Sequence, residues 1–456
     1  MDKKDVKKLS LFAITWPIFI ETFLHMTLRT ADTFMLSKVS DDAVAAVGVS
    51  NQIVMFLFFL FQVGATGAAV VVAQYLGAKK YNEIRSLAWN AITFNFLFGL
   101  VISIIMICFS GFFLSFFQLE KELFDQARIF LVIVGGGLVL QALMLTLSSI
   151  IQAHGYTRDT MFVTVGMNII NIIGNYVLIF GVFGFPQLGV TGVAISTVVS
   201  QFLGLIVNFM ILFKRVDIQL KFKDMIDWQK DRFYKILGVG IPTAIGQLSY
   251  SMSQIVTTGF IVVLGPELLT TRIYTLNILF FIIIFSLSLG RGTQIIVGHL
   301  IGAGEFDKAY KEGMRNLKLS MLLALGAATL IALFREQLMG IFTDNPLIVY
   351  TGATLLIMGL LLEPGRCFNI VLGQAIQAAG DARFVMMCSF IIIWGFSVPM
   401  YYLLGIHWGF GLFGIWIAFI ADEWLRGLVL YRRWRSRVWE KKVLVKHEKK
   451  KIEVTG

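Results

Sequence analysis

The sequence predicts an all-α integral membrane protein, with about twelve transmembrane helices in two pseudo-symmetric six-helix bundles. Composition is the first reason: 57% of the 456 residues are hydrophobic and 15% are charged, whereas soluble domains have about 25% charged residues. The mean hydropathy is +0.78. The second reason is that apolar runs long enough to cross a bilayer recur along the whole chain. The third is an internal repeat.

The repeat keeps a constant spacing over most of the chain. Pro17 recurs as Pro242, a shift of 242 − 17 = 225 residues, and the same shift pairs Gly77-Ala78 with Gly302-Ala303. A spacing kept over that distance indicates two copies of one unit. Repeats of this kind are a known building plan of secondary transporters, with the substrate cavity between the copies.

The expected units follow from the repeat and from the charged segment between its copies. They are an N-terminal bundle at 1–213, a cytoplasmic linker at 214–235, a C-terminal bundle at 236–434 and a basic cytoplasmic tail at 435–456. In chain order, we expect spans at 9–36, 44–75, 88–117, 124–152, 160–183 and 188–213, then at 236–264, 270–301, 313–342, 347–379, 382–405 and 408–432. Each is an apolar run of about 20 residues or more.

The distribution of Lys and Arg predicts the orientation of these spans. Most basic residues gather on one side, in the N-terminus, the linker, the tail and alternate loops, and the other side receives only Lys38, Lys121, Arg128, Arg272 and Arg335. The positive-inside rule then places both termini and the linker in the cytoplasm of a multi-pass protein of the cell (inner) membrane. The net charge of +11 therefore indicates contact with anionic headgroups rather than with a nucleic acid.

The first span carries an unusual number of ionisable side chains. It follows MDKKDVKK without a small-residue cleavage site, so we expect a membrane span here rather than a removed signal peptide. It contains Glu21, His25, Arg29 and Asp32. At about 100° per residue, Glu21 and Asp32 lie roughly 20° apart around the helix. A charge at membrane depth costs about 3 kcal/mol or more, so this polar stripe faces the protein interior or water.

The fifth span supplies amides that match the acid of the first span. Asn168, Asn171 and Asn175 follow one another at i, i+3 and i+7, on one helix face. Amide oxygens can bind a cation or accept hydrogen bonds. We expect Asp32, with these amides and Thr197 of the sixth span, to form the ion-coupling site of the N-terminal half.

Three further residues of the first span have expected roles. Glu21 is expected to belong to the ion-coupling site, and His25 and Arg29 to line the substrate cavity. Asp32 also has an alternative interpretation. It lies one turn from Arg29, so the two could form a salt bridge that only holds helices together.

The C-terminal half lacks these acids at the matching positions, where Asp32 corresponds to Thr257 and Glu21 to Gly246. Polar residues of the seventh, eighth and tenth spans are expected to line the substrate cavity instead; they are Gln247, Tyr250, Gln254, Arg291, Glu363, Arg366 and Asn369. Glu363 and Arg366 lie one turn apart, so they could instead pair only with each other.

No residue pattern predicts an enzyme. The Gly-rich stretches 64–67 and 290–292 lack the GK[ST] ending of a phosphate loop. The three cysteines, Cys108, Cys367 and Cys388, lie in apolar runs without disulfide or metal-site spacing. We therefore expect no catalytic residues and no cofactor other than H⁺ or Na⁺ as a coupling ion.

Several stretches carry a resemblance to a known family, and their order and duplication make the set specific. They are Ala31-Asp32-Thr33-Phe34-Met35, Ala73-Gln74-Tyr75-Leu76-Gly77-Ala78, Pro186-Gln187-Leu188-Gly189-Val190-Thr191-Gly192-Val193-Ala194 and Gln377-Ala378-Ala379-Gly380-Asp381-Ala382-Arg383. Over nearly its whole length, the chain resembles the multidrug and toxic compound extrusion family, abbreviated MATE.

This resemblance implies a V-shaped, monomeric antiporter that exports small molecules, often organic cations, across the lipid bilayer in exchange for Na⁺ or H⁺. It places the family's first-span Asp on Asp32 and its fifth-span Asn on Asn171. These two would be Na⁺ ligands if sodium is the coupling ion. The chain departs from the family where acids are expected in one branch or another: it has Asn175, Tyr250 and Phe368-Asn369 at those places.

A second interpretation stays within the same superfamily. A flippase for a lipid-linked precursor, or an exporter of an anionic metabolite, would need unpaired arginines in its cavity to bind phosphate or carboxylate groups. Arg29, Arg291 and Arg366 keep this interpretation open. The pairing of these arginines in the folded protein discriminates between the two.

Overall fold

The computed structural model describes residues 10–218 and 230–445, and all regular elements in these ranges are helices. The first group of elements is α1 (Leu11–Ser37), α2 (Asp41–Gly77), α3 (Tyr81–Ser115), α4 (Lys121–Gly136), α5 (Leu138–Ala153), α6 (Thr157–Phe180), the short 3₁₀ helix η1 (Val182–Gly184) and α7 (Val190–Lys214).

The second group is less regular, because π-helical turns interrupt two of its long helices. It comprises α9 (Lys230–Val263), α10 (Pro266–Gly302), α11 (Phe306–Leu333), α12 (Arg335–Gly340), α13 (Pro346–Cys367), η2 (Phe368–Leu372), α14 (Gly373–Ala378), α15 (Ala382–Ile392), η3 (Ile393–Ser397), α16 (Val398–Tyr402), η4 (Leu403–His407), α17 (Gly411–Arg435) and η5 (Val438–Lys442). The π-helical turns are η2, η3 and η4.

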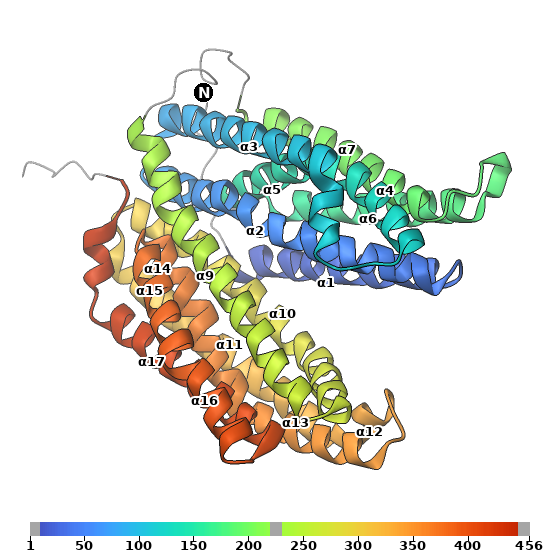
Figure 1. Cartoon of the computed structure of the whole chain (residues 1–456). Coiled ribbons are helices and arrows are strands. Elements are labelled where there is room, and N and C mark those ends of the chain that lie inside the picture. The colour runs from blue at the N-terminus through green and yellow to red at the C-terminus, as the bar shows by residue number, and fades with distance from the viewer. Residues whose placement is uncertain (1–9, 219–229, 446–456) are drawn as a thin grey trace, which may run out of the picture.

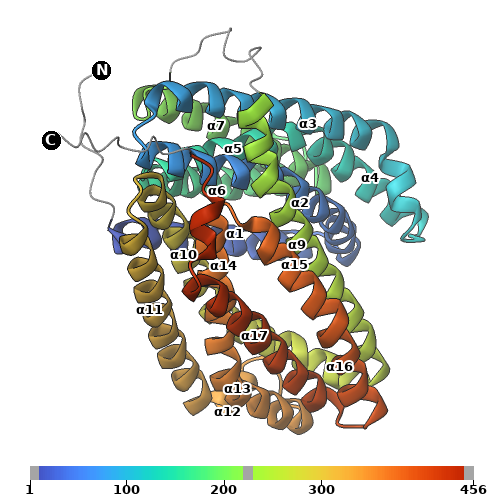
Figure 2. The same cartoon turned by 90° about the vertical axis from the view of Figure 1, so that its left-hand side faces the viewer.

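The two groups pack together at one end of the molecule and diverge toward the other (Figure 1). We call these the joined end and the open end. α2 and α10 finish at the joined end, whereas α1 starts there and runs toward the open end. α2 packs against both α9 and α10, and α1 packs against α10. Figure 2 shows the same contact between the groups after a turn of 90°.

Within the described residues, nine helices are long and apolar enough to cross a membrane, or ten if the pair α4 and α5 counts as one bent span. This pair is bent by 44° around Gly137. The multi-pass, all-helical prediction is confirmed. The expected number of about twelve also includes α9 and α17. Both are long helices, but their polar residues, such as Gln254 and Asp422, lower their mean hydropathy.

Several helices begin before the apolar runs that were predicted as spans. α3 begins at Tyr81 instead of residue 88, α11 at Phe306 instead of residue 313, and α9 at Lys230 instead of residue 236. Each helix begins with a polar turn, such as the one that contains Glu83 or Asp307. Acidic residues stabilise the first turn of a helix through its dipole, although hydropathy excludes them from a span.

The joined end is held by a pair of contacts related by the repeat. The Gln74 Nε2 donates to the Ala378 carbonyl oxygen at 2.6 Å, and the His299 Nε2 lies 2.7 Å from the Ala153 carbonyl oxygen. The shifts are 299 − 74 = 225 and 378 − 153 = 225. Each half thus binds the other through the same two positions.

Two glycines allow this close approach. A Cβ at Gly77 would meet the carbonyl oxygen of His299, and a Cβ at Gly302 would meet that of Gln74. Glycine is therefore required where α2 and α10 cross.

Candidate functional site

The structure brings the first-span acid and the fifth-span amides together within the first group of helices. The Asn175 Nδ2 donates to Asp32 Oδ1 at 2.6 Å and to Asn171 Oδ1 at 3.0 Å. The Asn171 Nδ2 donates to Thr197 Oγ1 at 3.3 Å. The four residues form one hydrogen-bonded chain from α1 through α6 to α7. Asn171 and Asn175 are buried, while Asp32 is partly exposed.

Asn168 lies on the same face of α6 but makes a different contact. Its Nδ2 donates to the Leu24 carbonyl oxygen at 3.1 Å, which anchors α6 to α1 one turn away from the carboxylate. The Oδ1 atoms of Asn168 and Asn175 are buried without a hydrogen-bond partner in the described part of the chain. A buried carbonyl oxygen without a donor is a costly arrangement. These oxygens and the Asp32 carboxylate are the type of ligand that binds Na⁺, and the carboxylate can also bind a proton.

Glu21 is held at a separate place nearer the joined end. Its Oε2 accepts hydrogen bonds from Gln152 Nε2 at 3.0 Å and from Thr160 Oγ1 at 3.1 Å. Arg291, from the second group, reaches α5 one turn from Gln152, the residue that holds the Glu21 carboxylate. Arg291 in turn donates to Gln294 Oε1 at 3.0 Å and to Ser149 Oγ at 3.3 Å.

Other predicted site residues lie apart from these two networks. The side chains of His25 and Gln247 are exposed, and the side chain of Arg29 lies outside the part that the structure describes. Gln254 Oε1 accepts a hydrogen bond from Arg272 NH2 at 2.7 Å, next to a cavity of ≈ 10 Å³ that Phe419 and Tyr401 also line. That volume holds about one water molecule.

The second group contains a buried cluster of charges. Arg366 NH1 donates to Glu363 Oε1 at 2.5 Å, so these two residues do pair, as the alternative interpretation allowed. The Arg366 Nε also lies 3.8 Å from Glu423 Oε1. Asn369 Nδ2 donates to Glu423 Oε2 at 2.5 Å. The ring of Tyr250 makes a cation–π contact with Arg426, whose guanidinium carbon lies 5.8 Å from the ring centroid.

Three members of this cluster were missed by the sequence analysis: Asp422, Glu423 and Arg426 of α17. Arg426 binds Asp422 through NH2 at 2.5 Å and Nε at 3.0 Å, and its NH2 lies 3.2 Å from Glu423 Oε1. All three side chains are buried. The signal was available, because Asp-Glu-x-x-Arg inside an apolar run obeys the same rule on membrane-depth charges that selected Glu21 and Asp32.

The cluster contains one more acid than base. Glu363, Asp422 and Glu423 supply three carboxyl groups, against the two guanidinium groups of Arg366 and Arg426. Glu363 Oε2 is buried without a hydrogen-bond partner among the described residues. With all five groups ionised, the cluster would therefore carry one net negative charge.

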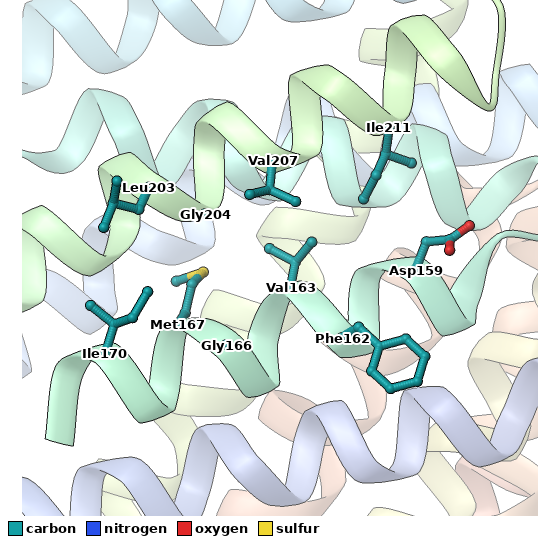
Figure 3. Close-up of a pocket in the computed structure, with 10 residues that line it drawn as sticks. All are labelled: Asp159, Phe162, Val163, Gly166, Met167, Ile170, Leu203, Gly204, Val207 and Ile211. Atoms are coloured by element: carbon teal, nitrogen blue, oxygen red, sulfur yellow. The ribbon is translucent and has the colours of Figure 1, made fainter. Parts of the chain in front are cut away.

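A groove of ≈ 250 Å³ lies between α6 and α7 (Figure 3). Its lining is apolar and includes Phe162, Met167 and Leu203, with Asp159 at one end. None of the predicted site residues lines it.

Comparison with known proteins identifies related chains. The family model described as MatE matches residues 17–177 and again residues 242–403. The uncharacterized transporter YisQ of Bacillus subtilis (strain 168) is 46% identical over 436 residues, 96% of each chain. The probable multidrug resistance protein NorM of Thermotoga maritima is 29% identical over 451 residues, 98% of this chain and 96% of that one.

Solved structures with a similar fold have lower sequence identity. A crystal structure of MATE in the bent conformation superposes with a TM-score of 0.88 at 19% identity and covers 95% of this chain and 96% of that one. An outward-facing conformation of a multidrug resistance MATE family transporter gives a TM-score of 0.86 at 20% identity, with 98% of each chain covered. A transporter of the MOP superfamily from Pyrococcus furiosus, described as having a binding pocket of reverse polarity, gives 0.85 at 18% identity over 95% and 96%.

Proposed function

Because this chain belongs to the MatE family of transporters, we propose that it is a secondary active antiporter that exports drugs or other toxic organic compounds in exchange for H⁺ or Na⁺. The observation that carries the proposal is the hydrogen-bonded chain from Asp32 through Asn175 and Asn171 to Thr197. It offers a carboxylate and spare amide oxygens to a small cation at membrane depth. Relatives named as multidrug resistance proteins support the substrate class.

The proposed architecture has twelve spans, with α9 and α17 added to the ten that length and composition support. The basic joined end would lie in the cytoplasm. The diverging helices would then face the outside, and the conformation would be outward-open. The export cycle would begin from this state by ion uptake.

The proposed coupling uses Asp32 as its titratable or cation-binding group. Asp32 takes up H⁺ or Na⁺ from outside, with Na⁺ held by the Asp32 carboxylate and the Asn171 amide oxygen. This neutralises the carboxylate and changes its bond to Asn175, which favours substrate release. One proton that moves down one pH unit yields about 1.4 kcal/mol, and its charge crossing 100 mV adds about 2.3 kcal/mol. Together these sustain a gradient of about 500-fold for a neutral substrate. For a monovalent organic cation exchanged one for one, no net charge moves and the pH term alone sustains about 10-fold.

Asp32→Asn tests the coupling. The variant keeps the size of the side chain and one hydrogen-bonding oxygen but cannot carry a proton, and it binds a cation weakly. We expect normal folding and no uptake of an organic cation into liposomes driven by an imposed H⁺ or Na⁺ gradient. Ion-driven transport at the wild-type rate would reject Asp32 as the coupling residue. Drug-susceptibility profiling of cells that express the wild type would identify the substrate.

The flippase or anion-exporter alternative receives less support. Arg366 is paired with Glu363 and Glu423, and Arg291 is hydrogen-bonded to Gln294 and Ser149. Arginines that are already bound to protein groups are poorly placed to hold a pyrophosphate. Ion-driven uptake of an organic anion, with no uptake of an organic cation, would favour the anion-exporter alternative instead.

A further inference from the structure

Glu21 and Arg291 lie on opposite sides of the contact between the two groups of helices. Glu21 is on α1 and is held by Gln152 and Thr160, both of the first group. Arg291 is on α10, yet it reaches across to Ser149. Ser149 and Gln152 lie one turn apart on α5, so this helix brings the two charged side chains together.

The surroundings of Glu21 contain little else that is charged. Gln152 on α5 and Thr160 on α6 are neutral, and His25 lies one turn further along α1. Arg291 of α10 is the cation that approaches from the second group, since it bonds Ser149 one turn from Gln152. His299 on α10 bonds to the Ala153 carbonyl oxygen instead. Within residues 10–218 and 230–445, both hydrogen bonds to the Glu21 carboxylate reach Oε2. The side chain is partly exposed, so water has access to it.

We infer that Glu21 is a proton-binding group that controls the opening of the joined end. When it is ionised, its attraction to Arg291 keeps this end closed. This rests on the alternating access of the proposed function. Opening the joined end moves α10 away from α1 and leaves an ionised Glu21 without its counter-charge. A proton from water, forming an O–H bond on the carboxyl group, removes the attraction and the penalty of separation. Protonation of Glu21 therefore permits opening.

The test measures the joined end directly and needs no substrate. Spin labels on cysteines introduced at Lys79 and Ala303, two exposed positions after α2 and α10, report its opening by pulsed EPR when the native cysteines are replaced by Ala. Glu21→Gln mimics the protonated state, and we expect about a tenfold rise in the long-distance population. Arg291→Gln removes the other charge, and the same shift is expected.

Asp159→Asn is the matched control, because this carboxylate contacts Arg215 within the first group. It should leave the distance distribution unchanged. The wild type should open as the pH falls, and Glu21→Gln should no longer respond to pH. An unchanged distribution in Glu21→Gln, or a pH response that persists in it, would overturn the inference. Failure of the antiport proposal would show as absent ion-driven uptake with the distance changes intact.

An independent observation concerns the end of the described chain. After α17, Trp439 stacks on Trp434 with ring centroids 4.3 Å apart, and both are fully buried. The chain then returns to the first group (Figure 2). The Leu444 N–H donates to Gln74 Oε1 at 2.9 Å, and Val445 is 3% exposed in a hydrophobic cluster built mainly from α2, α3 and α5.

This segment, residues 442–445, bridges both groups. The Leu444 side chain packs against Val70 of α2, Val239 of α9 and Ala382 of α15. A Cβ on Gly380 would meet the Lys442 carbonyl oxygen, so the segment also lies against the turn before α15. Gln74 is thus bonded on one side to Ala378 and on the other to the segment. Its repeat counterpart His299 has Nδ1 buried without a partner among the described residues.

We propose that residues 442–445 are a brace that packs against both halves at the joined end and must detach before that end opens. Its contacts are made by both halves, so their separation breaks them. The brace therefore stabilises the conformation in which the joined end is closed. It also distinguishes the two repeat-related contacts at the joined end, because the segment bonds Gln74 and not its counterpart His299 among the described residues.

Val445→Asp places a charge in the hydrophobic cluster that Val445 joins. The distance between spin labels at Lys79 and Ala303 again reports how far the joined end opens. We expect at least about a fivefold rise in the open population, since a buried unpaired carboxylate is strongly unfavourable. A chain that ends after Val443 should show the same rise, and a chain that ends after Val445 serves as its control. A lower melting temperature with unchanged distances would mean that the segment is only structural, and would overturn the proposal.

Discussion

The two halves share a fold but fill their interiors with different chemistry. In the first half, one carboxylate, Asp32, is surrounded by neutral amides and a hydroxyl. In the second half, three carboxyl groups and two guanidinium groups pair with one another around Glu423. The position that matches Asp32 is Thr257, whose hydroxyl donates to the Ser253 carbonyl oxygen of its own helix. Duplication thus preserved the helices and not the polar residues between them.

This difference indicates that the two halves have different roles. The first half has spare acceptors, Asn168 Oδ1 and Asn175 Oδ1, and so can take in a cation. The second half satisfies most of its charges internally, and it carries the π-helical turns η2 and η3, which contribute Asn369 and Ser397 to the cluster. Such turns commonly occur at functional sites. The following predictions, in order of decreasing effect, test this contrast.

Arg426→Ala should be the most damaging change. It leaves Asp422, Glu363 and Glu423 with a single guanidinium, and loss of one member of a buried ion pair costs about 3–5 kcal/mol. Thermal unfolding in detergent measures the loss. Arg435→Ala, on the exposed face of the same helix, should change stability by about 0.5 kcal/mol or less. Equal effects of the two variants would remove the basis for the contrast.

Asn175→Ala should have an intermediate effect on stability and a large one on transport. It removes the donor to Asp32 at the cost of a buried hydrogen bond, about 1–3 kcal/mol. Ion-driven uptake should fall by about tenfold or more. Asn208→Ala is the matched control, because this buried amide of α7 bonds Ser148 outside the network. Its uptake per folded protein should stay normal. A similar uptake in both variants would contradict a special role for Asn175.

Glu363→Gln should cost about 1 kcal/mol or less. The amide oxygen can still accept from Arg366, and the cluster then holds two carboxyl groups and two guanidinium groups. The same unfolding measurement checks this. A loss as large as that of Arg426→Ala would show that all three carboxyl groups are needed as counter-charges.

Lys308→Ala should have the smallest effect, about 0.5 kcal/mol or less. Its pair with Glu305 is 3.0 Å long, but both side chains are exposed to water, and such pairs contribute little. A loss above about 1 kcal/mol would show that surface charges at this end matter as much as the buried cluster.

Helical periodicity placed Asn171 and Asn175 on one face of their helix, and the match of amides to an acid predicted that this face meets Asp32. The structure shows Asn175 bonded to both Asp32 and Asn171, although their role in ion coupling stays a prediction. The analysis did not predict that Arg291 crosses to Ser149, because neither residue lies in a polar stripe that points to a partner helix. The π-helical turns were equally invisible, since no local pattern separates them from an α-helix.

The packing of Val445 has a consequence for how the protein is made. This residue belongs to a hydrophobic cluster of the first bundle, yet the ribosome adds it after all the helices of the second bundle. The first bundle therefore inserts into the membrane with that part of its interior unfinished. That side chain becomes available only after the second bundle has been made, so the first bundle does not reach its mature packing alone.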